Sequence, residues 1–240
     1  MKDMQHASFT KRTLLYFAAS SFVALLCVSH YAQAQTVSNP DFLITWKTSG
    51  SNIPSFYVGK ALPTYGSQIT ASLELVSGGK ILNLSGQTIY WYLNDTLIGG
   101  GSGVQQVTFP PFGAPPSVLD LRVVLPNYNG SYFEHSIQIP MVNAEVVMYA
   151  PYPNGQFSNN PLTLTAIPYF FDVTDATKLS YTWTVNGITG TSAENPQQAQ
   201  ITLPQGTTSG ASVSVSVSAE NNIDSTIAAA SENLTYQSQL

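Results

Sequence analysis

One six-residue strand pattern occurs twice in the chain, centred on Trp91 and on Trp183. Its two copies read Ile-Tyr-Trp-Tyr-Leu-Asn at 89–94 and Tyr-Thr-Trp-Thr-Val-Asn at 181–186. In both, a large apolar side chain stands at every second position, the period of a strand with one buried face, and a turn-forming Asn-Asp or Asn-Gly follows. A large aromatic side chain on an inner strand fills the core of a β-sandwich. The pattern therefore predicts one sandwich made twice, with Trp91 and Trp183 as core residues.

Three further landmarks keep a constant offset between the two halves of the chain. The members of each pair are 94 residues apart: Pro110 and Pro204, Leu121 and Val215, Asn127 and Asn221. The two tryptophans are only 92 residues apart. We therefore expect a two-residue difference in length in the hairpin that follows each Trp strand, where loop length is least constrained.

Alternating apolar residues predict about seven strands in each half, which is the number in an immunoglobulin-like sandwich of about 100 residues. A glycine-rich run at 99–103 is predicted to be a flexible turn, because glycine adopts positive φ at little cost. We predict an all-β fold of two tandem immunoglobulin-like β-sandwich domains, at 35–140 and 141–240, joined by a short linker at 140–143. The strands are expected at 42–47, 69–75, 88–94, 104–109, 118–125, 132–139, 146–149, 162–167, 181–186, 199–203, 211–219 and 225–234.

The first 34 residues have the pattern of a helical secretory signal peptide. Lys11 and Arg12 precede an uncharged apolar run that ends in Ala32-Gln33-Ala34, a small-residue cleavage motif. The run is shorter than the roughly 20 residues that a helix needs to span a bilayer. Cleavage would remove Cys27, the only cysteine, so an exported mature chain would hold no disulfide. An uncleaved segment acting as a membrane anchor is the alternative.

Charge is sparse and acidic, which excludes several classes of partner. The whole chain has 8 Lys and Arg against 13 Asp and Glu, for a net charge of −5. Nucleic-acid binding requires clustered basic side chains, and the sequence has no such cluster. We expect no nucleic-acid partner, and contact with a membrane only through the N-terminal segment if it stays uncleaved.

The resemblance of the chain to known families rests on the Trp strands with their Asn turns, the strand that ends in Pro, and the Val-rich strand that ends in Asn. Together these features resemble the tandem Ig-like and polycystic-kidney-disease-like (PKD-like) domains of exported bacterial proteins, over residues 40–236. The turns Asn94-Asp95 and Asn186-Gly187 depart from the Asp-rich turn of PKD domains, so the broader Ig-like family is the better description. The resemblance implies an extracellular, cell-surface or periplasmic location and supplies no function. A loop beginning at Phe56 also resembles one in uncharacterised two-domain envelope proteins.

Residues suited to catalysis or metal binding are few. Beyond residue 34 the only histidine is His135, which alternation places with Phe133 and Ile137, and no Gly-x-Ser-x-Gly motif is present. The acid pairs nearest in sequence, which a glycosidase would need, are Asp172 with Asp175 and Glu220 with Asp224. Both pairs lie in turn-like segments, where solvated acids are the simpler interpretation. A loop calcium site using Asp172, Asp175 or Asp224 has no Asp-x-Asp-x-Asp-Gly motif to support it. We expect no enzyme, no metal and no cofactor.

Loop aromatics are the best candidates for contact with a ligand or partner. The candidate residues are Phe56, Tyr57, Tyr65, Tyr152 and Tyr169. They would act together only if they form one contiguous exposed patch; otherwise they fill the core or bridge the domains. We expect a non-enzymatic exported cell-envelope protein whose Ig-like modules serve as a spacer, adhesion or protein-assembly unit, with other envelope proteins or surface glycans as partners. A carbohydrate-binding protein that uses the loop aromatics is the alternative.

Overall fold

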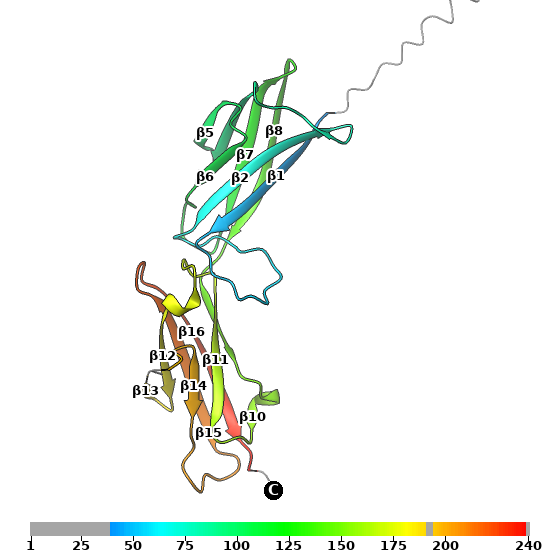
Figure 1. Cartoon of the computed structure of the whole chain (residues 1–240). Helices are drawn as coiled ribbons and strands as arrows, with labels where there is room; N and C mark the ends of the chain where they lie inside the picture. The colour runs from blue at the N-terminus through cyan, green and yellow to red at the C-terminus, as the bar shows by residue number, and fades with distance from the viewer. Residues whose placement is uncertain (1–38, 191–193, 239–240) are drawn as a thin grey trace, which may run out of the picture. The chain divides into compact units, whose positions relative to one another are not determined.

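The structure is a computed structural model that describes residues 39–190 and 194–238. The predicted signal peptide at 1–34, with Cys27, lies outside these residues. The described residues are almost entirely strands and connecting loops, as predicted, and they form two β-sandwiches of immunoglobulin-like type (Figure 1). Two 3-10 helices of three residues each, η2 (Pro153–Gly155) and η3 (Ala176–Lys178), are the described helical segments.

The first sandwich has one sheet in which β2 pairs with β1 on one side and with β6 and β3 on the other, and a second sheet in the order β5-β4-β7-β8. All of these pairings are antiparallel. Strand bounds are β1 Asp41–Ser49, β2 Gln68–Ser77, β3 Lys80–Ile81, β4 Thr88–Leu93, β5 Thr96–Ser102, β6 Gln106–Phe109, β7 Ser117–Tyr128 and β8 Ser131–Met141.

The second sandwich repeats this arrangement, with sheets in the orders β14-β11-β9 and β10-β16-β15-β12-β13. The added strand β10 pairs with β16 in parallel. In both copies the strand after the Trp strand stays in the sheet of the Trp strand, instead of joining the opposite sheet as strand D of a constant-type immunoglobulin domain does. Bounds are β9 Glu145–Tyr149, β10 Gln156–Phe157, β11 Leu162–Tyr169, β12 Ser180–Val185, β13 Ile188–Gly190, β14 Gln198–Ile201, β15 Ser212–Asn221 and β16 Thr226–Tyr236.

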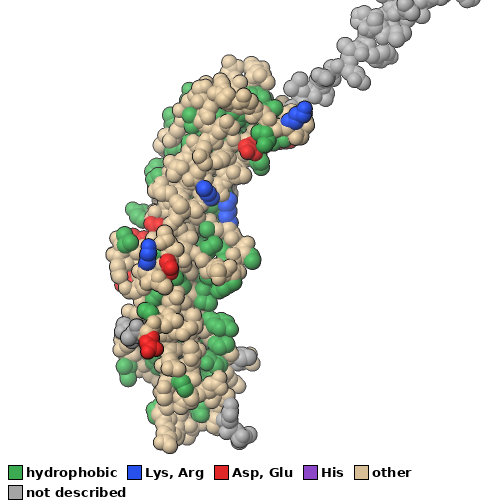
Figure 2. Space-filling view, viewed as in Figure 1, with side chains coloured by type: hydrophobic (Ala, Val, Ile, Leu, Met, Phe, Trp, Pro, Cys, Tyr) green, Lys and Arg blue, Asp and Glu red, His purple; other side chains and the backbone are tan. Residues whose placement is uncertain are grey.

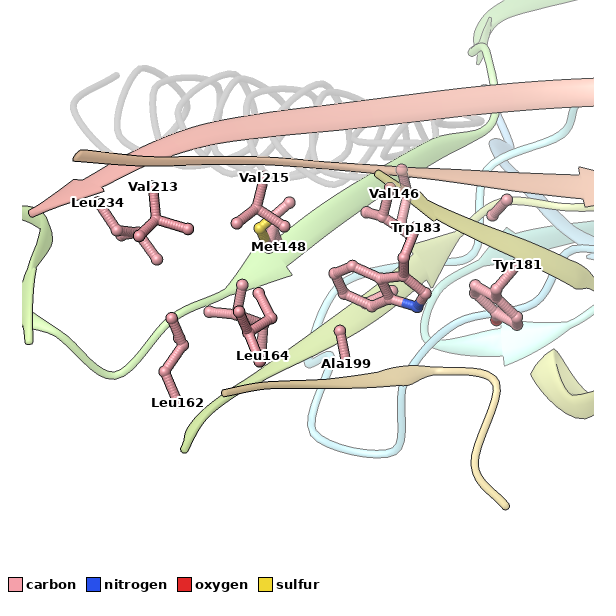
Figure 3. Close-up of a cluster of buried hydrophobic side chains, with 14 of the residues drawn as sticks. Val146, Met148, Leu162, Leu164, Tyr181, Trp183, Ala199, Val213, Val215 and Leu234 are labelled. Carbon is pink, nitrogen blue, oxygen red and sulfur yellow. The ribbon is translucent and has the colours of Figure 1, made fainter. Parts of the chain in front are cut away.

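Each sandwich has its own hydrophobic core, because alternate side chains of its strands point between the two sheets. Every second residue of β2 from Ile69 to Leu75 is buried, and the same holds for β15 from Val213 to Ala219. Trp91 and Trp183 are 0% and 3% exposed. Figure 3 shows the indole of Trp183 among the aliphatic side chains of the facing strands. Each core therefore contains one buried tryptophan.

The two tryptophans also make the same hydrogen bond. Trp91 Nε1 donates to the carbonyl oxygen of Val104 at 2.8 Å, and Trp183 Nε1 donates to that of Pro196 at 3.0 Å. In both cases the acceptor lies 13 residues further along the chain. A buried indole NH needs such a partner, so the duplication extends from the apolar pattern to the polar contacts of the core.

Type I′ turns close the hairpins after both Trp strands, as the Asn-Asp and Asn-Gly pairs indicate. Asn94 and Asp95 have φ of 46° and 64°, and Asn186 and Gly187 have φ of 50° and 81°. Each asparagine also binds the neighbouring strand: the Asn94 side chain accepts from the backbone NH of Asp120, and that of Asn186 from Ser214, both at 2.9 Å.

The glycine run at 99–103 is not the turn that composition predicts. Gly99, Gly100 and Gly101 lie within β5, paired with Trp91, Tyr90 and Ile89 of β4. A Cβ on Gly99 would come within 2.9 Å of Val107 Cγ1. One on Gly100 would meet the ring of Tyr90 and lie 3.0 Å from the carbonyl oxygen of Ile89. The prediction was wrong because glycine here provides room between strands rather than a bend.

The predicted linker at 140–143 is partly strand. Pro140 and Met141 pair with Val118 and Ser117, so β8 continues to Met141, and β9 begins at Glu145. Met141 is 1% exposed, which explains why the strand continues past the proline into a buried position. The division at residue 140 remains a prediction.

Candidate functional site

Residues 50–67 join β1 to β2 within the first sandwich and make contacts with the second sandwich. We call this segment the junction loop. Its own hydrogen bonds shape it: the Tyr57 NH donates to the Pro54 carbonyl at 2.9 Å, and the Thr64 NH donates to Ser67 Oγ at 2.8 Å. Thr64 and Ser67 are 5% and 0% exposed, yet their polar atoms are paired with each other. A loop stabilised in this way presents its remaining side chains from a defined backbone.

Asn52 in the junction loop makes three hydrogen bonds to the end of β11 and the residues after it. Its backbone NH donates to the Phe171 carbonyl at 2.8 Å, and its carbonyl accepts from the Phe170 NH at 2.6 Å. Its side-chain Nδ2 donates to the Pro168 carbonyl at 3.2 Å. The exchange of two backbone bonds with neighbouring residues resembles one rung of a β-ladder, so Asn52 joins the loop to the second sandwich.

Phe170 has an unusual backbone conformation at this contact. Its φ is 60°, in the left-handed region that bulky side chains rarely adopt. Such strain persists only where surrounding contacts hold it. The bond to Asn52 and the burial of Phe170 at 9% exposure supply those contacts.

Tyr57 packs edge-on against two aromatic rings of the second sandwich. Its ring centroid lies 5.9 Å from that of Tyr169 and 5.8 Å from that of Phe170. Of the five candidate aromatics, the structure brings together Tyr57 and Tyr169, in the bridging arrangement that was the alternative to an exposed patch. Phe56 and Tyr65 are 63% and 72% exposed on the same loop.

Tyr152 lies elsewhere in the second sandwich. Its ring is 5.7 Å from that of Phe157, which in turn packs on Tyr236, and its hydroxyl accepts from the Thr163 NH at 3.2 Å. The candidate aromatics are thus divided: Tyr57 and Tyr169 meet at the junction, whereas Tyr152 packs on Phe157. Among the described residues, Tyr152 makes no ring contact with the junction aromatics.

Asp172 places its carboxylate against two glycines of the junction loop. A Cβ at Gly50 or at Gly66 would overlap Asp172 Oδ1 or Oδ2, so a side chain at either position would displace the carboxylate. Burial raises the pKa of Asp172, and the negative charge of Asp224 raises it further. The structure thus couples Asp172 with Asp224, whereas the sequence paired Asp172 with Asp175 and Asp224 with Glu220.

The other candidate acid and base residues have structural contacts. Asp175 caps η3, and its Oδ1 accepts from the Thr177 NH at 2.8 Å, which lowers its pKa. His135 is exposed on β8 and stacks on Phe42, with ring centroids 5.6 Å apart. Within residues 39–190 and 194–238, no group of three or more His, Cys, Asp or Glu side chains is arranged to hold a metal ion. In the same ranges, no helix has the length and apolar character needed to cross a membrane.

A cleft of about 360 Å³ lies beside the Asn52 contact. The junction loop forms one wall from Asn52 to Phe56, and the second sandwich forms the other with β11, the residues just before and within η3, and Gln197. The lining includes amide, hydroxyl and carboxylate side chains next to Phe56.

The surface around these features carries few charges. Figure 2 shows mainly uncharged polar and hydrophobic side chains on the visible face, with isolated acidic and basic groups. One charged network lies on the first sandwich, where Arg122 contacts Asp95 at 3.0 Å and Glu134 at 3.5 Å and stacks over the Tyr92 ring. Lys60, in the junction loop, lies 3.6 Å above the ring of Trp46.

No protein-family model matches the chain, and no curated protein matches its sequence. Among solved structures, it is similar to fibronectin(III)-like modules of Clostridium thermocellum CbhA, with 18% identity, a TM-score of 0.31, and coverage of 82% of this chain and 94% of that one. It is also similar to three N-terminal domains of the bacteriophage RB49 outer capsid protein Hoc, with 16% identity, a TM-score of 0.40, and coverage of 82% and 59%. A third is a C-terminal fragment of intimin in complex with its receptor, with 10% identity, a TM-score of 0.31, and coverage of 83% and 64%. Likenesses this distant do not identify a function.

Sequence reasoning missed Asn52 and the coupling of Asp172 with Asp224. Asn52 belongs to no motif, and its role depends on backbone groups more than 100 residues away. Gly50 and Gly66 were the available signal, because glycines on either side of a long loop indicate close approach of another group.

Proposed function

We propose that this chain is a non-enzymatic, exported protein of the bacterial cell envelope, and that its two Ig-like modules act as a spacer, adhesion or protein-assembly unit. The observation that carries the proposal is the junction, where Asn52 makes three hydrogen bonds and Tyr57 packs on Tyr169 and Phe170. Sandwiches in one chain move relative to each other unless contacts restrain them. Contacts of this kind suit a protein that keeps its partners at a set spacing.

The positions of the candidate catalytic residues support a non-enzymatic role. His135 stacks on Phe42, and Asp175 is engaged in capping η3. A stacked imidazole and a carboxylate that caps a helix are both accounted for by structural contacts, without a base oriented by a second side chain as acyl transfer requires.

The test is to produce the full chain with a carboxyl-terminal tag in a bacterium, fractionate the cells, and cross-link intact cells. We expect the protein in an exported fraction with Gln35 as its first residue, and discrete cross-linked products with envelope proteins. Asn52→Ala should leave export unchanged and reduce the yield of those products. Retention in the cytoplasm with an intact amino terminus, or export with no cross-linked product, would contradict the proposal.

A further inference from the structure

The cleft beside the junction loop has the size and position of a ligand site. Its volume of about 360 Å³ falls within the roughly 300 to 1,000 Å³ typical of small-molecule sites, which occur preferentially where folded units meet. The spacer role does not require this cleft, so its lining calls for a separate explanation.

Six of the thirteen lining residues carry hydrogen-bonding side chains. Asn52 and Gln197 contribute amides, Ser55, Thr165 and Thr174 contribute hydroxyls, and Asp175 contributes a carboxylate. Gln197 Nε2 donates to the Tyr181 hydroxyl at 3.2 Å, which orients the amide. Amides and hydroxyls both donate and accept, so they match ligands whose groups do the same.

The charges at the cleft favour an uncharged ligand. The Thr177 NH bond lowers the pKa of Asp175, so this carboxylate is ionised at neutral pH and serves as a strong acceptor for hydroxyl donors. Lys178 lies nearby, with its Nζ donating to Thr174 Oγ1 at 2.8 Å, and its charge also acts on Asp175. None of the described lining residues is Lys or Arg. A phosphate or carboxylate ligand would therefore be repelled by the Asp175 carboxylate, while the ammonium group of Lys178 is already bonded to Thr174 Oγ1.

Two exposed aromatic rings border the polar groups. Phe56, 63% exposed, belongs to the loop wall of the cleft. Thr165, on the opposite wall, pairs with Tyr149 of β9 in the register of the sheet, and paired residues share a face. Tyr149 is 55% exposed, so the outer face of β9 and β11 continues from the cleft to a second ring. Flat apolar rings next to amides and hydroxyls match the two kinds of surface on a sugar ring.

We propose that this cleft, with Phe56 and Tyr149 at its borders, binds a neutral oligosaccharide. One sugar unit lies in the cleft, where its hydroxyls bond to Asn52, Gln197 and Asp175 and its apolar face packs on Phe56. The adjoining units extend across Thr165 toward Tyr149. The ligand is recognised by hydroxyl geometry and ring stacking, without an ion pair.

The experiment is isothermal titration of the mature chain with a fixed panel of neutral oligosaccharides (cello-, xylo-, manno- and chito-oligosaccharides) and with heparin oligosaccharides as the acidic counterpart. We expect saturable binding of at least one neutral member and none of heparin. Phe56→Ala and Gln197→Ala should each weaken that binding by about tenfold, the effect of losing one good stacking or hydrogen-bonding contact.

Phe112→Ala is the control, because Phe112 is 48% exposed and is not part of the cleft. This variant should bind the neutral oligosaccharide with the affinity of the parent. Circular dichroism on each variant separates lost binding from lost folding. The proposal is overturned if no neutral oligosaccharide binds the folded protein. It is also overturned if Phe56→Ala and Gln197→Ala bind as tightly as the parent, or if heparin oligosaccharides bind as tightly as the neutral ones. None of these outcomes depends on whether the protein acts as an envelope spacer.

Discussion

At the scale of single residues, the indole NH groups of Trp91 and Trp183 make the same hydrogen bond at equivalent positions of the two sandwiches. Each ring is enclosed by its core, and each NH reaches a carbonyl 13 residues later in the segment before the next strand of the opposite sheet. An apolar residue of similar size would fill the volume but leave that carbonyl without its donor. The tryptophans therefore link core packing to the position of a loop.

Replacement of either tryptophan by phenylalanine tests this role. Trp91→Phe and Trp183→Phe should each lower the free energy of unfolding by about 1 to 3 kcal/mol, because each leaves a small cavity and removes the indole hydrogen bond. Urea unfolding followed by circular dichroism measures the loss. A cost well below 0.5 kcal/mol at either position would show that the hydrogen bond and ring volume are not needed there.

The Asp172 carboxylate at the junction predicts a pH dependence. Its pKa is raised in the folded chain, by burial first and by Asp224 second. The unfolded chain then loses its proton at a lower pH than the folded chain does. Stability from this group is complete below the ordinary pKa of 3.8 and declines as pH rises through the elevated value. Asp172→Asn should remove this decline and leave stability above that range higher than in the parent.

Thermal unfolding between pH 3 and pH 8 measures the difference between Asp172→Asn and the parent. The matched control is Asp120→Asn, at an exposed position on β7, which should follow the parent curve. If the difference between Asp172→Asn and the parent stays constant over the whole range, the carboxylate does not titrate as described.

At the scale of elements, the strand after the Trp strand can be compared between the two copies at one shared position. In the first copy this strand, β5, has a bulge beside Trp91, and in the second it is β13. Gly99 and Gly190 occupy the same register position, each opposite its tryptophan. Only Gly99 has a neighbour within reach of an added Cβ, Val107 Cγ1 at 2.9 Å, because β5 lies against β6.

Alanine at these two equivalent glycines should have opposite effects. Gly99→Ala should destabilise the protein by about 1 to 2 kcal/mol, since the stiff Val107 side chain must shift. Gly190→Ala should be neutral or stabilise it by up to about 1 kcal/mol, because the added methyl meets no atom of the described residues within 4 Å and reduces the freedom of the unfolded chain. Denaturant midpoints of the two variants compare them directly; equal costs would contradict the difference in packing.

At the scale of the whole described chain, the junction loop decides whether the two cores respond together. The cores are separate clusters, each complete within its own sandwich. The junction adds the Asn52 bonds, the Tyr57 ring contacts, and a hydrogen bond from the Val142 NH to the Pro63 carbonyl at 3.0 Å. We expect these contacts to couple the unfolding of one sandwich to that of the other.

Asn52→Ala should weaken this coupling. The loss of its side-chain bond to the Pro168 carbonyl costs about 1 kcal/mol, and we expect the calorimetric transition to broaden or separate into two. Protease cleavage within the junction loop should become faster as well. Ser55→Ala, an exposed neighbour in the same loop, is the control and should unfold like the parent. An unchanged single transition and unchanged cleavage in Asn52→Ala would show that the coupling resides elsewhere.

Local patterns in the sequence predicted the all-β class, the positions of most strands along the chain and the turns after both Trp strands. These features depend on alternation, turn chemistry and repetition, which neighbouring residues express together. The two-residue difference between the copies was also visible, but its predicted place was wrong. Both indole bonds span 13 residues, and β14 begins 92 residues after β6, the same offset as the two tryptophans. The extra residues therefore lie between β14 and β15, which the asparagine bonds enclose with spans of 26 residues in the first copy and 28 in the second. Gly99, Gly100 and Gly101 were misread, because a glycine that bends the chain and a glycine that makes room for a neighbour look alike in composition.

The candidate site depended on tertiary structure throughout. Asn52 meets a backbone carbonyl 116 residues away, Tyr57 meets Tyr169, and the charge of Asp224 raises the pKa of Asp172. No period or spacing relates these residues, because the folding of two separate sandwiches brings their loops together. The sequence by itself determined that there are two sandwiches built around Trp91 and Trp183. Only the tertiary structure decided that the junction loop joins them and leaves a polar cleft at its side, since those contacts form between loops whose positions the two cores set.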